Sequence, residues 1–535
     1  MITRTYSTFL AIAFLLLGMS CYIQFAGGDA GDKNWLLYAA GMLLKGKKLY
    51  VDIVEANPPL IHWLYSIPVY IARKINVEDY HVLVMLGLCA IASTIVLVLR
   101  LVQYHSTFNA NVRRQLELAL LLAFVLIFRV DPSYFFDRDH IFIVLTLPYV
   151  LRWLPSLART SFPLWLNILV GGMAAIGFSI KPHCLIVFAG IQLLYLLRER
   201  SFAILASTEN IILYVGVTFY LLCIFYFEPA YVYTVFPMAL QTYGAFARRL
   251  EGLLYVCIAL LTFAASFVDF RLGHSSPFRR DIYYLAGLCI FLLCYGLSNN
   301  GWGYSYNPLI TYLLVISGWL IWEFSYLRQL KHEQGVSAKQ FTYGLYANVI
   351  TLSAHAIFGM LIIIGCFVGV WRFHCEEHPS CMTIMQEVKT PQGVRSFATM
   401  SIVMGNWSQV SRASGAPWQS RFISLWMVYK FLISKADFVN SHRWILDYTG
   451  HALAEDLRKM KPEVVFIDSA VRPIVMHEQV DLPAYFSVYP DFKLEWQKYR
   501  YIHNINYCDK SNDIKTKNKT IAQGCNFDIY YRNPD

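Results

Sequence analysis

The chain contains eleven separate stretches that are apolar over roughly the length needed to cross a lipid bilayer. A helix that spans the hydrocarbon core needs about 20 consecutive apolar residues. The stretches cover residues 7–26, 80–101, 115–130, 139–157, 163–180, 184–197, 209–227, 251–269, 282–298, 307–324 and 348–370. They predict a polytopic α-helical membrane protein with about eleven transmembrane helices. Only Arg4 precedes the first stretch and no clear small-x-small cleavage site follows it, so we expect an uncleaved helix rather than a signal peptide.

The composition agrees with a chain that faces lipid. Charged residues make up only 15% of the sequence, whereas soluble domains have about 25%. Tyr and Phe occur 36 times each, as expected where aromatic belts mark the two membrane interfaces. The net charge of +10 is scattered over short loops rather than gathered on one basic face, which argues against nucleic acid as a partner.

The basic residues of the loops predict the orientation, because cytoplasmic loops carry an excess of Lys and Arg. The loops after the second, fourth, sixth, eighth and tenth stretches carry Arg113 and Arg114, Arg159, Arg198 and Arg200, Arg271, Arg279 and Arg280, and Arg328, Lys331 and Lys339. With Arg4 they mark the cytoplasmic side. Eleven spans then place the N-terminus in the cytoplasm and residues 371–535 outside it, in a multi-pass protein expected in a bacterial inner membrane.

The cysteines support the same location for the C-terminal region. Four of the 12 Cys, namely Cys375, Cys381, Cys508 and Cys525, follow the last apolar stretch. An even number of Cys in a polar region suggests two disulfides in an oxidising compartment. We predict the pairs Cys375–Cys381 and Cys508–Cys525, the nearest-neighbour choice among the possible connectivities.

Two regions follow from this topology. Residues 1–370 are predicted to form the transmembrane region, and residues 371–535 an extracytoplasmic α/β domain. Within the second region, residues 456–468 have the pattern of a helix end, a turn and a buried strand that ends in an acid.

The first external loop, residues 27–79, is long and partly apolar. A membrane span within it would reverse every later loop and place the Arg clusters outside. We therefore predict two amphipathic helices on the membrane surface, at 33–46 and 58–74, each flanked by Lys or Arg. Long loops are commonly functional.

Residues capable of chemistry gather in the predicted external loops, whereas the opposite side carries mainly Arg and Lys. The candidates are Asp29, Asp32, Glu55 and Asn57 in the first loop, Asp137, Arg138, Asp139 and His140 in the second, Lys181 and His183 in the third, Arg248 and Arg249 in the fourth, and Asn300, Trp302 and Tyr304 in the fifth. Acids, bases, amides and aromatic rings on one face predict a site on that face.

Each group also has a purely structural interpretation. Asp29 and Asp32 would cap the helix that begins near residue 34, and Glu55 would be a solvated loop acid. The acids on either side of Arg138 would cap a helix and form a local ion pair. Lys181 and His183 would snorkel to the interface, and the aromatic residues of the fifth loop would form a girdle. External cations are harder to explain in this way, because the positive-inside rule argues against them.

The first external loop resembles that of the GT-C glycosyltransferases. The run from Asp32 to Gly46, then Leu49-Tyr50-Val51-Asp52 and Glu55-Ala-Asn-Pro-Pro-Leu60, is closest to the lipid A aminoarabinose transferases and the protein O-mannosyltransferases. In those families an acid after the first helix precedes a surface helix, and a Lys- or His-Pro-Pro-Leu element follows. The sequence similarity covers about residues 29–75. Beyond them, the chain shares with these families only the number of helices and the presence of an external C-terminal domain.

The resemblance implies roles for individual residues. The family's loop acid falls on Asp32, with Asp29 as the alternative, and would be the general base that takes a proton from the acceptor. Cations would stabilise the leaving polyprenyl phosphate; the candidates are Lys181, Arg138, Arg248 and Arg249. This chain departs from the pattern at Asn57, where relatives have Lys or His. Glu55 is outside the pattern, and either orients the acceptor or helps an Asp to hold a divalent metal.

The resemblance implies an inverting transfer of a sugar from a polyprenyl-phosphate donor to a lipid, glycan or protein acceptor at the external leaflet, with no cofactor that the sequence requires. Two alternatives stay open. One is a transporter or flippase for a lipid-linked glycan, which would carry ionisable residues at mid-membrane; the predicted spans are nearly free of charge. The other keeps the fold but polymerises or ligates glycan chains.

Overall fold

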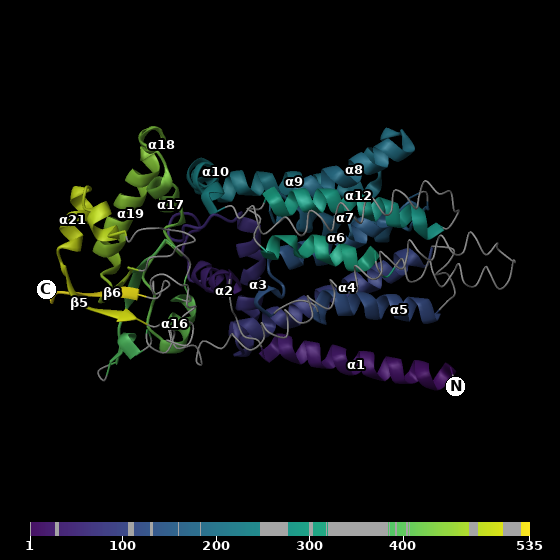
Figure 1. The fold of residues 1–535 in the computed structure, drawn as a ribbon, viewed down its shortest axis with the longest axis horizontal. Helices are drawn as coiled ribbons and strands as arrows, with labels where there is room; N and C mark the ends of the chain where they lie inside the picture. The colour runs from purple at the N-terminus through teal and green to yellow at the C-terminus, as the bar shows by residue number, and fades with distance from the viewer. Residues whose placement is uncertain are drawn as a thin grey trace, which may run out of the picture. The chain divides into compact units, whose positions relative to one another are not determined.

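The computed structural model describes residues 2–26, 32–104, 112–128, 132–158, 160–181, 183–246, 277–298, 303–316, 318, 384, 386–390, 393–402, 405, 407–469, 480–506 and 526–534. The chain divides into two compact units (Figure 1). We call the first the helical unit, made of Met1–Gly28, Trp63–Cys223 and Ala247–Trp371. We call the second the mixed unit, made of Asp29–His62, Ile224–Phe246 and Arg372–Asp535.

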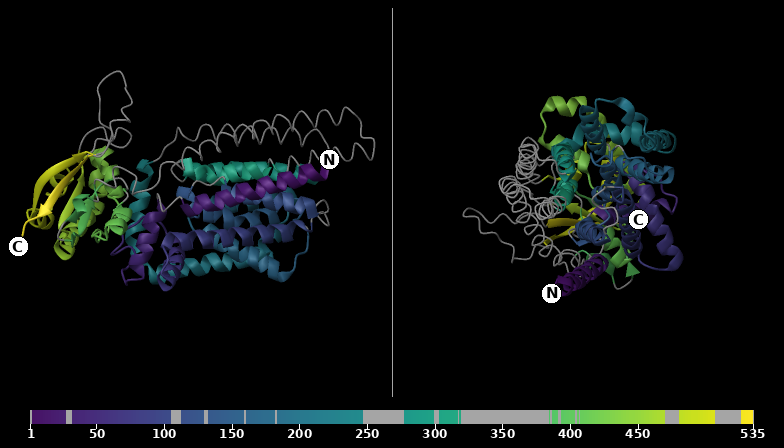
Figure 2. Two further views of the ribbon diagram at one scale, coloured as in Figure 1. Left: turned by 90° about the horizontal axis from the view of Figure 1, so that it is seen from below. Right: turned by 90° about the vertical axis from the view of Figure 1, so that its right-hand side faces the viewer.

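The helical unit consists of helices that run side by side (Figure 2). Its elements are α1 (Ile2–Ala26), most of α3 (Pro59–Ile75), α4 (Asp79–Val102), α5 (Val112–Ala123), the π-helix η1 (Phe124–Phe128), the 3-10 turn η2 (Pro132–Tyr134), α6 (Arg138–Arg152), α7 (Leu164–Ser179), α8 (Cys184–Glu199), the 3-10 turn η3 (Phe202–Ala206), most of α9 (Thr208–Phe227), α12 (Pro277–Ser298) and the 3-10 turn η6 (Gly303–Tyr306). A further apolar helix covers Asn307–Ile316.

Small residues allow the helices of this unit to approach closely. A Cβ atom on Gly171 of α7 would lie 2.5 Å from the backbone oxygen of Glu209 in α9. A Cβ atom on Gly177 would lie 2.7 Å from the Thr146 side chain of α6. Only glycine permits these distances, as is common where helices pack inside a membrane.

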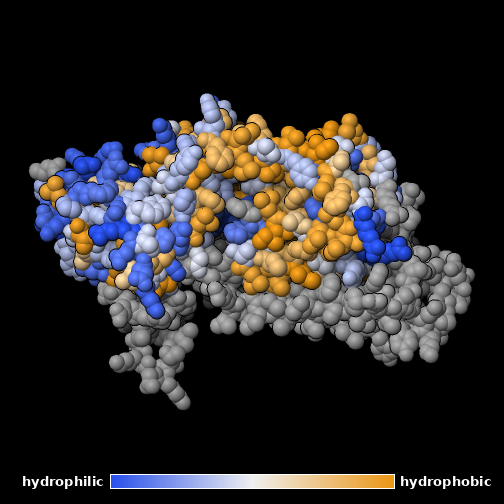
Figure 3. Space-filling model, turned by 90° about the horizontal axis from the view of Figure 1, so that it is seen from above, coloured by the Kyte–Doolittle hydropathy of each residue, from blue (hydrophilic) through white to orange (hydrophobic). Residues whose placement is uncertain are grey.

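The helices lie where the hydropathy pattern predicts them. Three of the described helices, Asp79–Val102, Thr208–Phe227 and Arg280–Ser298, are long and apolar enough to cross a membrane. Shorter apolar helices cover Phe14–Ala26, Gln115–Ile127, Leu164–Ser179 and Asn307–Ile316. Hydrophobic side chains dominate the visible surface of these helices (Figure 3). The predicted spans 251–269 and 348–370 lie outside the described residues, and so does part of 307–324.

The mixed unit combines helices with a small sheet. Its elements are α2 (Asp32–Leu43), the first residues of α3, the end of α9, the π-helix η4 (Tyr231–Val235), α10 (Phe236–Thr242), the 3-10 turn η5 (Tyr243–Phe246), β1 (Lys389–Thr390), β2 (Gly393–Val394), β3 (Phe397–Met400), α16 (Trp407–Ser414), α17 (Trp426–Ile433), α18 (Ala436–Ser441), α19 (Arg443–Met460), β4 (Val464–Asp468), α20 (Leu482–Phe486), α21 (Pro490–Trp496), β5 (Tyr499–Asn506) and β6 (Asn526–Arg532).

The four-stranded sheet of the mixed unit has the order β3-β4-β6-β5. The β3–β4 pair is parallel, and β6 runs antiparallel to both β4 and β5. Trp407 of α16 packs on one face, with ring centroids 5.6 Å from Phe466 and 5.0 Å from Phe527. On the other face, Trp496 of α21 lies 4.8 Å from Tyr530. The sheet therefore has helices on both faces (Figure 2).

The predicted helix, turn and strand near residue 460 are present. Helix α19 ends at Met460, and Lys461 adopts a left-handed conformation with φ of 48°. Strand β4 follows, and all its residues are buried through to Asp468. The four late cysteines lie outside the described residues, so their pairing stays a prediction. The described cysteines Cys21, Cys89, Cys184, Cys223, Cys289 and Cys294 are free thiols.

Both helices predicted in the first external loop form, as α2 and α3, but α2 is not the half-exposed surface helix that we expected. Eight of its 12 residues are buried, including Lys33, Asn34 and Trp35. Its contacts are with the C-terminal part of the mixed unit, so the loop folds together with residues more than 370 positions later.

Candidate functional site

Asp32, the predicted general base, is the first residue of α2 and is half-buried. A carboxylate in this position interacts favourably with the positive end of the helix dipole. Its neighbour Asp29 lies outside the described residues. The structure therefore presents Asp32 at a helix N-terminus with part of its surface open.

The C-terminal part of the mixed unit holds α2 in place. Arg412 of α16 donates a hydrogen bond to the Asn34 side chain. The Tyr38 hydroxyl donates to the Trp418 carbonyl at 3.0 Å, and the Trp35 and Trp418 rings lie 5.5 Å apart. These contacts fix the helix that begins with Asp32. No local sequence signal pointed to them.

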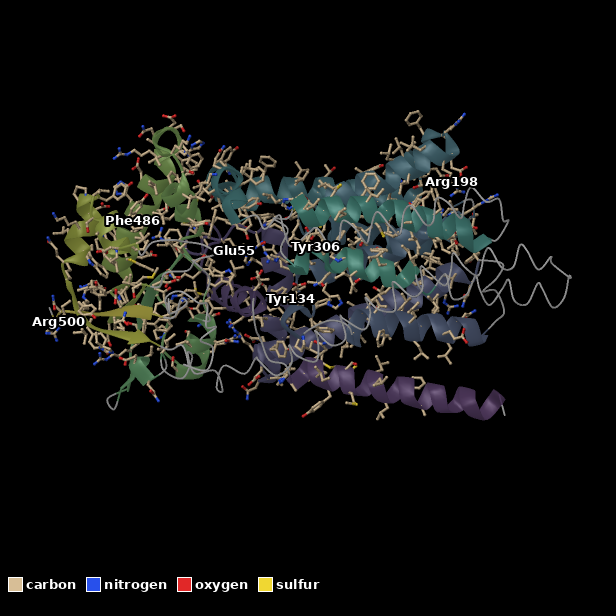
Figure 4. The ribbon with its side chains drawn as sticks, viewed as in Figure 1. Glu55, Tyr134, Arg198, Tyr306, Phe486 and Arg500 are labelled. Atoms are coloured by element: carbon tan, nitrogen blue, oxygen red, sulfur yellow. The ribbon has the colours of Figure 1, made fainter. Side chains whose placement is uncertain are left out.

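The buried side chains of Glu55 and His62 form a cluster with the half-buried Asn57 at the start of α3 (Glu55 is labelled in Figure 4). Asn57 Nδ2 lies 2.6 Å and 2.7 Å from the two carboxylate oxygens of Glu55. His62 Nε2 lies 3.2 Å from Glu55 Oε2. Glu55 is only 5% exposed, so its interpretation as a solvated loop acid is wrong. The sequence analysis did not name His62 as a candidate, although His62 lies within the first external loop.

The two prolines between Glu55 and His62 explain this local geometry. Pro58 favours an extended conformation in Asn57 before it. Pro59 is the first residue of α3, where its fixed φ suits a helix start. His62 then lies one turn into the helix and faces back to Glu55. The Tyr50 hydroxyl also donates to the Asn57 carbonyl at 2.6 Å, from a left-handed backbone with φ of 63°.

A distant segment closes this cluster. The ring of Tyr231, in η4, lies 4.8 Å from that of Tyr50. Burial raises the pKa of Tyr231 above its usual value, and the negative charge of Glu55 raises it further. Tyr231 is therefore a neutral phenol beside a buried carboxylate. It is a second residue that sequence reasoning missed, because 176 positions separate it from Glu55.

Helix α19 fixes the backbone beside Glu55 through Arg421. The Val54 amide donates to the Arg421 carbonyl at 2.7 Å. The Arg421 side chain is held by Asp456, with Nε 2.7 Å from Oδ1, and by Glu455, with Nη2 2.8 Å from Oε2. Asp456 also accepts the Arg421 amide at 3.1 Å. The ion pairs of Arg421 with Glu455 and Asp456 of α19 thus help to set the position of Val54, the residue before Glu55.

Asp456→Asn is expected to lower the free energy of unfolding by about 1.5–3 kcal/mol, because it removes charge-assisted hydrogen bonds to Arg421 at a buried position. Lys459→Ala is the matched control on the same helix, since its pair with Glu455 is exposed and should contribute less than about 0.5 kcal/mol. Unfolding of the purified full chain in detergent, compared with wild type, measures both. Equal effects of the two substitutions would contradict this assignment.

A second cluster of predicted residues lies at the start of α6 in the helical unit. Asp137 is the N-cap of this helix and accepts the His140 amide at 2.9 Å, which confirms the capping interpretation. His140 Nδ1 accepts the Phe136 amide at 2.8 Å. Burial, followed by the charge of Asp139, raises the pKa of Asp137 to about 7. Burial therefore disfavours the charged form of the Asp137 carboxyl.

Asp139 and Lys181 form a buried ion pair in the same cluster. Lys181 Nζ lies 3.0 Å and 3.3 Å from the two Asp139 oxygens, and the side chains are 6% and 1% exposed. Tyr295 of α12 donates a hydrogen bond to Asp139 Oδ1. A snorkelling lysine would keep its ammonium in water, so that interpretation of Lys181 is wrong. The sequence analysis named Asp139 and Lys181 as candidate site residues. It did not predict that they pair, or that Tyr295 donates a hydrogen bond to Asp139.

Packing holds Tyr295 against the ion pair. Its ring stacks on Phe142 with centroids 5.4 Å apart. A Cβ atom on the neighbouring Gly296 would lie 2.6 Å from the Tyr306 ring, so this close approach requires glycine. Arg138 is also buried. Burial, together with the charge of Lys181, lowers the pKa of the half-buried His183, which favours a neutral imidazole.

The other predicted site residues are not placed by the structure. Arg248, Arg249, Asn300 and Trp302 lie outside the described residues, and Tyr304 is described only as part of the backbone turn η6. Within the described ranges, no group of three or more His, Cys, Asp or Glu side chains has the arrangement of a metal site.

No protein-family model matches the chain, and no curated protein matches it. Among solved structures, it is similar to ArnT from Cupriavidus metallidurans bound to undecaprenyl phosphate, with 11% identity over 100% of both chains and a TM-score of 0.49. It is also similar to the same protein in the apo state, with 10% identity, 99% of this chain and 100% of that chain covered, and a TM-score of 0.48. At these identities and TM-scores, the function proposed below rests on this chain's own residues.

Proposed function

We propose that the chain is a membrane glycosyltransferase that moves a sugar from a polyprenyl-phosphate donor to an acceptor on the extracytoplasmic side, with inversion at the sugar carbon. The observation that carries this proposal is the cluster of Glu55, Asn57 and His62 at the start of α3. Glu55 and Asn57 belong to the Glu-Ala-Asn-Pro-Pro-Leu element, and His62 follows this element by two residues. The loop that resembles the GT-C loop thus brings an acid, an amide and an imidazole together, although Glu55 and Asn57 are not residues of the family pattern.

Asp32 is the general base in this proposal. It takes the proton from the acceptor hydroxyl or amine as that group attacks the sugar carbon, while the bond to the lipid phosphate breaks on the opposite side. Asp32 is half-buried at a helix N-terminus. Glu55 is engaged by Asn57 and His62. We therefore assign Glu55 and Asn57 to orienting the loop. A carboxylate within hydrogen-bond reach of the nucleophile is what the proton transfer needs.

The candidates for binding the donor phosphate in this proposal are the cations Lys181, Arg138, Arg248 and Arg249. In the helical unit, Arg138 and Lys181 are buried cations and Asp137 and Asp139 are buried carboxyls, and Lys181 pairs with Asp139. Burial raises the pKa of Asp137, so less negative charge faces these cations than two ionised carboxylates would supply. Lys181 can share its three donors between Asp139 and a phosphate oxygen. The predicted cations Arg248 and Arg249 would add to this charge.

The transporter alternative receives less support from the described helices. The buried pair Arg152–Glu209, 3.0 Å apart, joins the last residue of α6 to the second residue of α9. Asp139 and Lys181 also lie at or just before a helix start. A transport pathway would place such groups near mid-membrane, whereas these lie at helix ends. A polymerase or ligase of the same fold would share the mechanism and differ in its acceptor.

Mass spectrometry of envelope glycans from a deletion strain tests the proposal. One sugar substituent should be missing, its polyprenyl-phosphate precursor should accumulate, and wild-type protein should restore both. An Asp32→Asn protein that inserts normally should restore neither. Unchanged glycans and lipid-linked precursors in the deletion strain would rule out the transferase.

The predicted orientation is tested by reporter fusions. A reporter that is active only outside the cytoplasm should be active when fused after residue 372 and silent when fused near residue 279, because the Arg-rich loops stay inside. The opposite pattern would place the two loop clusters in the cytoplasm and remove the basis for an extracytoplasmic reaction.

A further inference from the structure

The segment that joins α17 to α19 projects charged and apolar side chains together. We call residues 430–444, from the end of α17 through α18 to the start of α19, the cationic elbow. None of the residues of α18 is buried. Two apolar residues flank α18 and are exposed: Ile433, the last residue of α17, by 52%, and Trp444, near the start of α19, by 40%. Figure 3 looks onto the side of the mixed unit that carries α18.

The elbow has a defined internal structure and a positive charge. Phe438 packs against Phe431 with centroids 5.2 Å apart and stacks on His442 at 4.3 Å. The Lys430 ammonium lies 5.5 Å from the centre of the Phe438 ring. Lys430, Lys435 and Arg443 provide three cations, and the carboxylates beside them are Asp437 in the elbow and Asp447, whose Oδ1 lies 3.7 Å from Arg443 Nε. An exposed Trp and Ile beside these cations resemble the polar and apolar faces of a segment that lies in a lipid headgroup layer.

The elbow is also connected to a membrane helix. Helix α17 packs against α10 and η5, and the Tyr243 and Trp426 rings lie 5.9 Å apart. These elements follow the candidate membrane span α9 after only a few residues. The end of α9 and the adjoining η4 and α10 expose large side chains, namely Phe225, Tyr226, Phe227, Tyr233, Phe236 and Leu240. Aromatic residues at the end of a span are typical of the membrane interface, so α17 packs against a segment with the composition of an interface.

We propose that the cationic elbow is a lipid-binding surface. Ile433 and Trp444 contact the outer edge of the acyl chains, and Lys430, Lys435 and Arg443 contact anionic headgroups. Charge complementarity selects an anionic lipid surface as the occupant, because basic residues next to apolar side chains are attracted to such lipids. The proposal does not depend on the reaction that the protein catalyses.

Photo-crosslinking of the full chain in nanodiscs identifies the occupant directly. The nanodiscs contain phosphatidylcholine and phosphatidylglycerol, and p-benzoylphenylalanine replaces Ile433. Phe219, exposed on α9, is the lipid-facing positive control, and Leu494, exposed on α21, is the control within the mixed unit. We expect lipid adducts at Ile433 and Phe219 and none at Leu494. An Ile433 probe that yields no lipid adduct, or that crosslinks to a second copy of the chain, would overturn the proposal.

The charge contribution is tested in the same experiment. At Ile433, the ratio of phosphatidylglycerol to phosphatidylcholine adducts should exceed that of the bilayer. Lys430→Gln and Lys435→Gln should each reduce this enrichment by up to about fivefold at low salt, since each cation near an anionic surface is attracted independently. The adduct with phosphatidylcholine should persist, which shows that the elbow still folds. An unchanged ratio would refute the role of the cations.

Discussion

Asp32→Asn is expected to reduce sugar transfer by about 10²–10⁴-fold, the usual contribution of a general base. Asparagine keeps the size of the side chain and its place at the start of α2, so folding and membrane insertion should survive. Donor binding should stay near normal, because the substitution does not touch the buried cations of the helical unit. Transfer from a polyprenyl-phosphate sugar in membranes, measured beside binding of the same donor, separates the two effects.

Asp29→Asn and Glu55→Gln are the comparisons for this experiment. If Asp29 serves only as a cap, its substitution costs about 1 kcal/mol of local stability and little activity. Glu55→Gln disturbs the hydrogen bonds to Asn57 and His62, so it should lower stability together with activity. Full activity of Asp32→Asn, with loss in Asp29→Asn, would make Asp29 the base. If neither Asp32→Asn nor Asp29→Asn affects transfer, the proposed mechanism is wrong and the transporter alternative should be tested next.

Lys181→Met is expected to destabilise the protein by about 3–5 kcal/mol, because it leaves the carboxylate of Asp139 buried without its cation. The two side chains are 6% and 1% exposed, so water does not replace the lost partner. Thermal unfolding of the purified protein in detergent measures the loss. A change below about 1 kcal/mol would show that the pair contributes no more than an exposed ion pair.

The double variant Asp139→Asn/Lys181→Met separates folding from function. Removing both charges of a buried pair is often neutral or stabilising, so most of the stability should return. The Tyr295 hydroxyl can still donate to the asparagine oxygen. If Lys181 binds the donor phosphate, the stable double variant remains unable to bind the donor. Recovery of both stability and transfer would show that the pair only supports the fold.

Hydropathy alone located the helices of the helical unit. The pattern at 80–101 and 209–227 corresponds to α4 (Asp79–Val102) and α9 (Thr208–Phe227). It succeeded because a helix in lipid must satisfy its own backbone and present apolar side chains along its length. The same local physics located α2, α3 and the turn between α19 and β4. The positions of charged side chains were less well predicted. Arg152 and Glu209 form an ion pair within the predicted spans 139–157 and 209–227, which we expected to be nearly uncharged.

The surroundings of the loop acids were decided only by the tertiary structure. The apolar periodicity of α2 indicated a helix that rests on the membrane, but Trp418 and Arg412 bury it, and they come about 380 positions later in the chain. Glu55 is buried because the prolines begin α3 next to it and because Tyr231 closes the cluster from another segment.

The sequence by itself determined where the described apolar helices, α2 and α3 lie and which residues carry charge in the loops. It did not determine that Lys181 is neutralised by Asp139 or that Tyr295 completes the pair. Helix formation depends on neighbours within a few residues along the chain, so a local pattern predicts it. The electrostatics of a buried group depend on which distant residue excludes water and which supplies the opposite charge. Those partners are chosen by packing, and only the folded chain shows them.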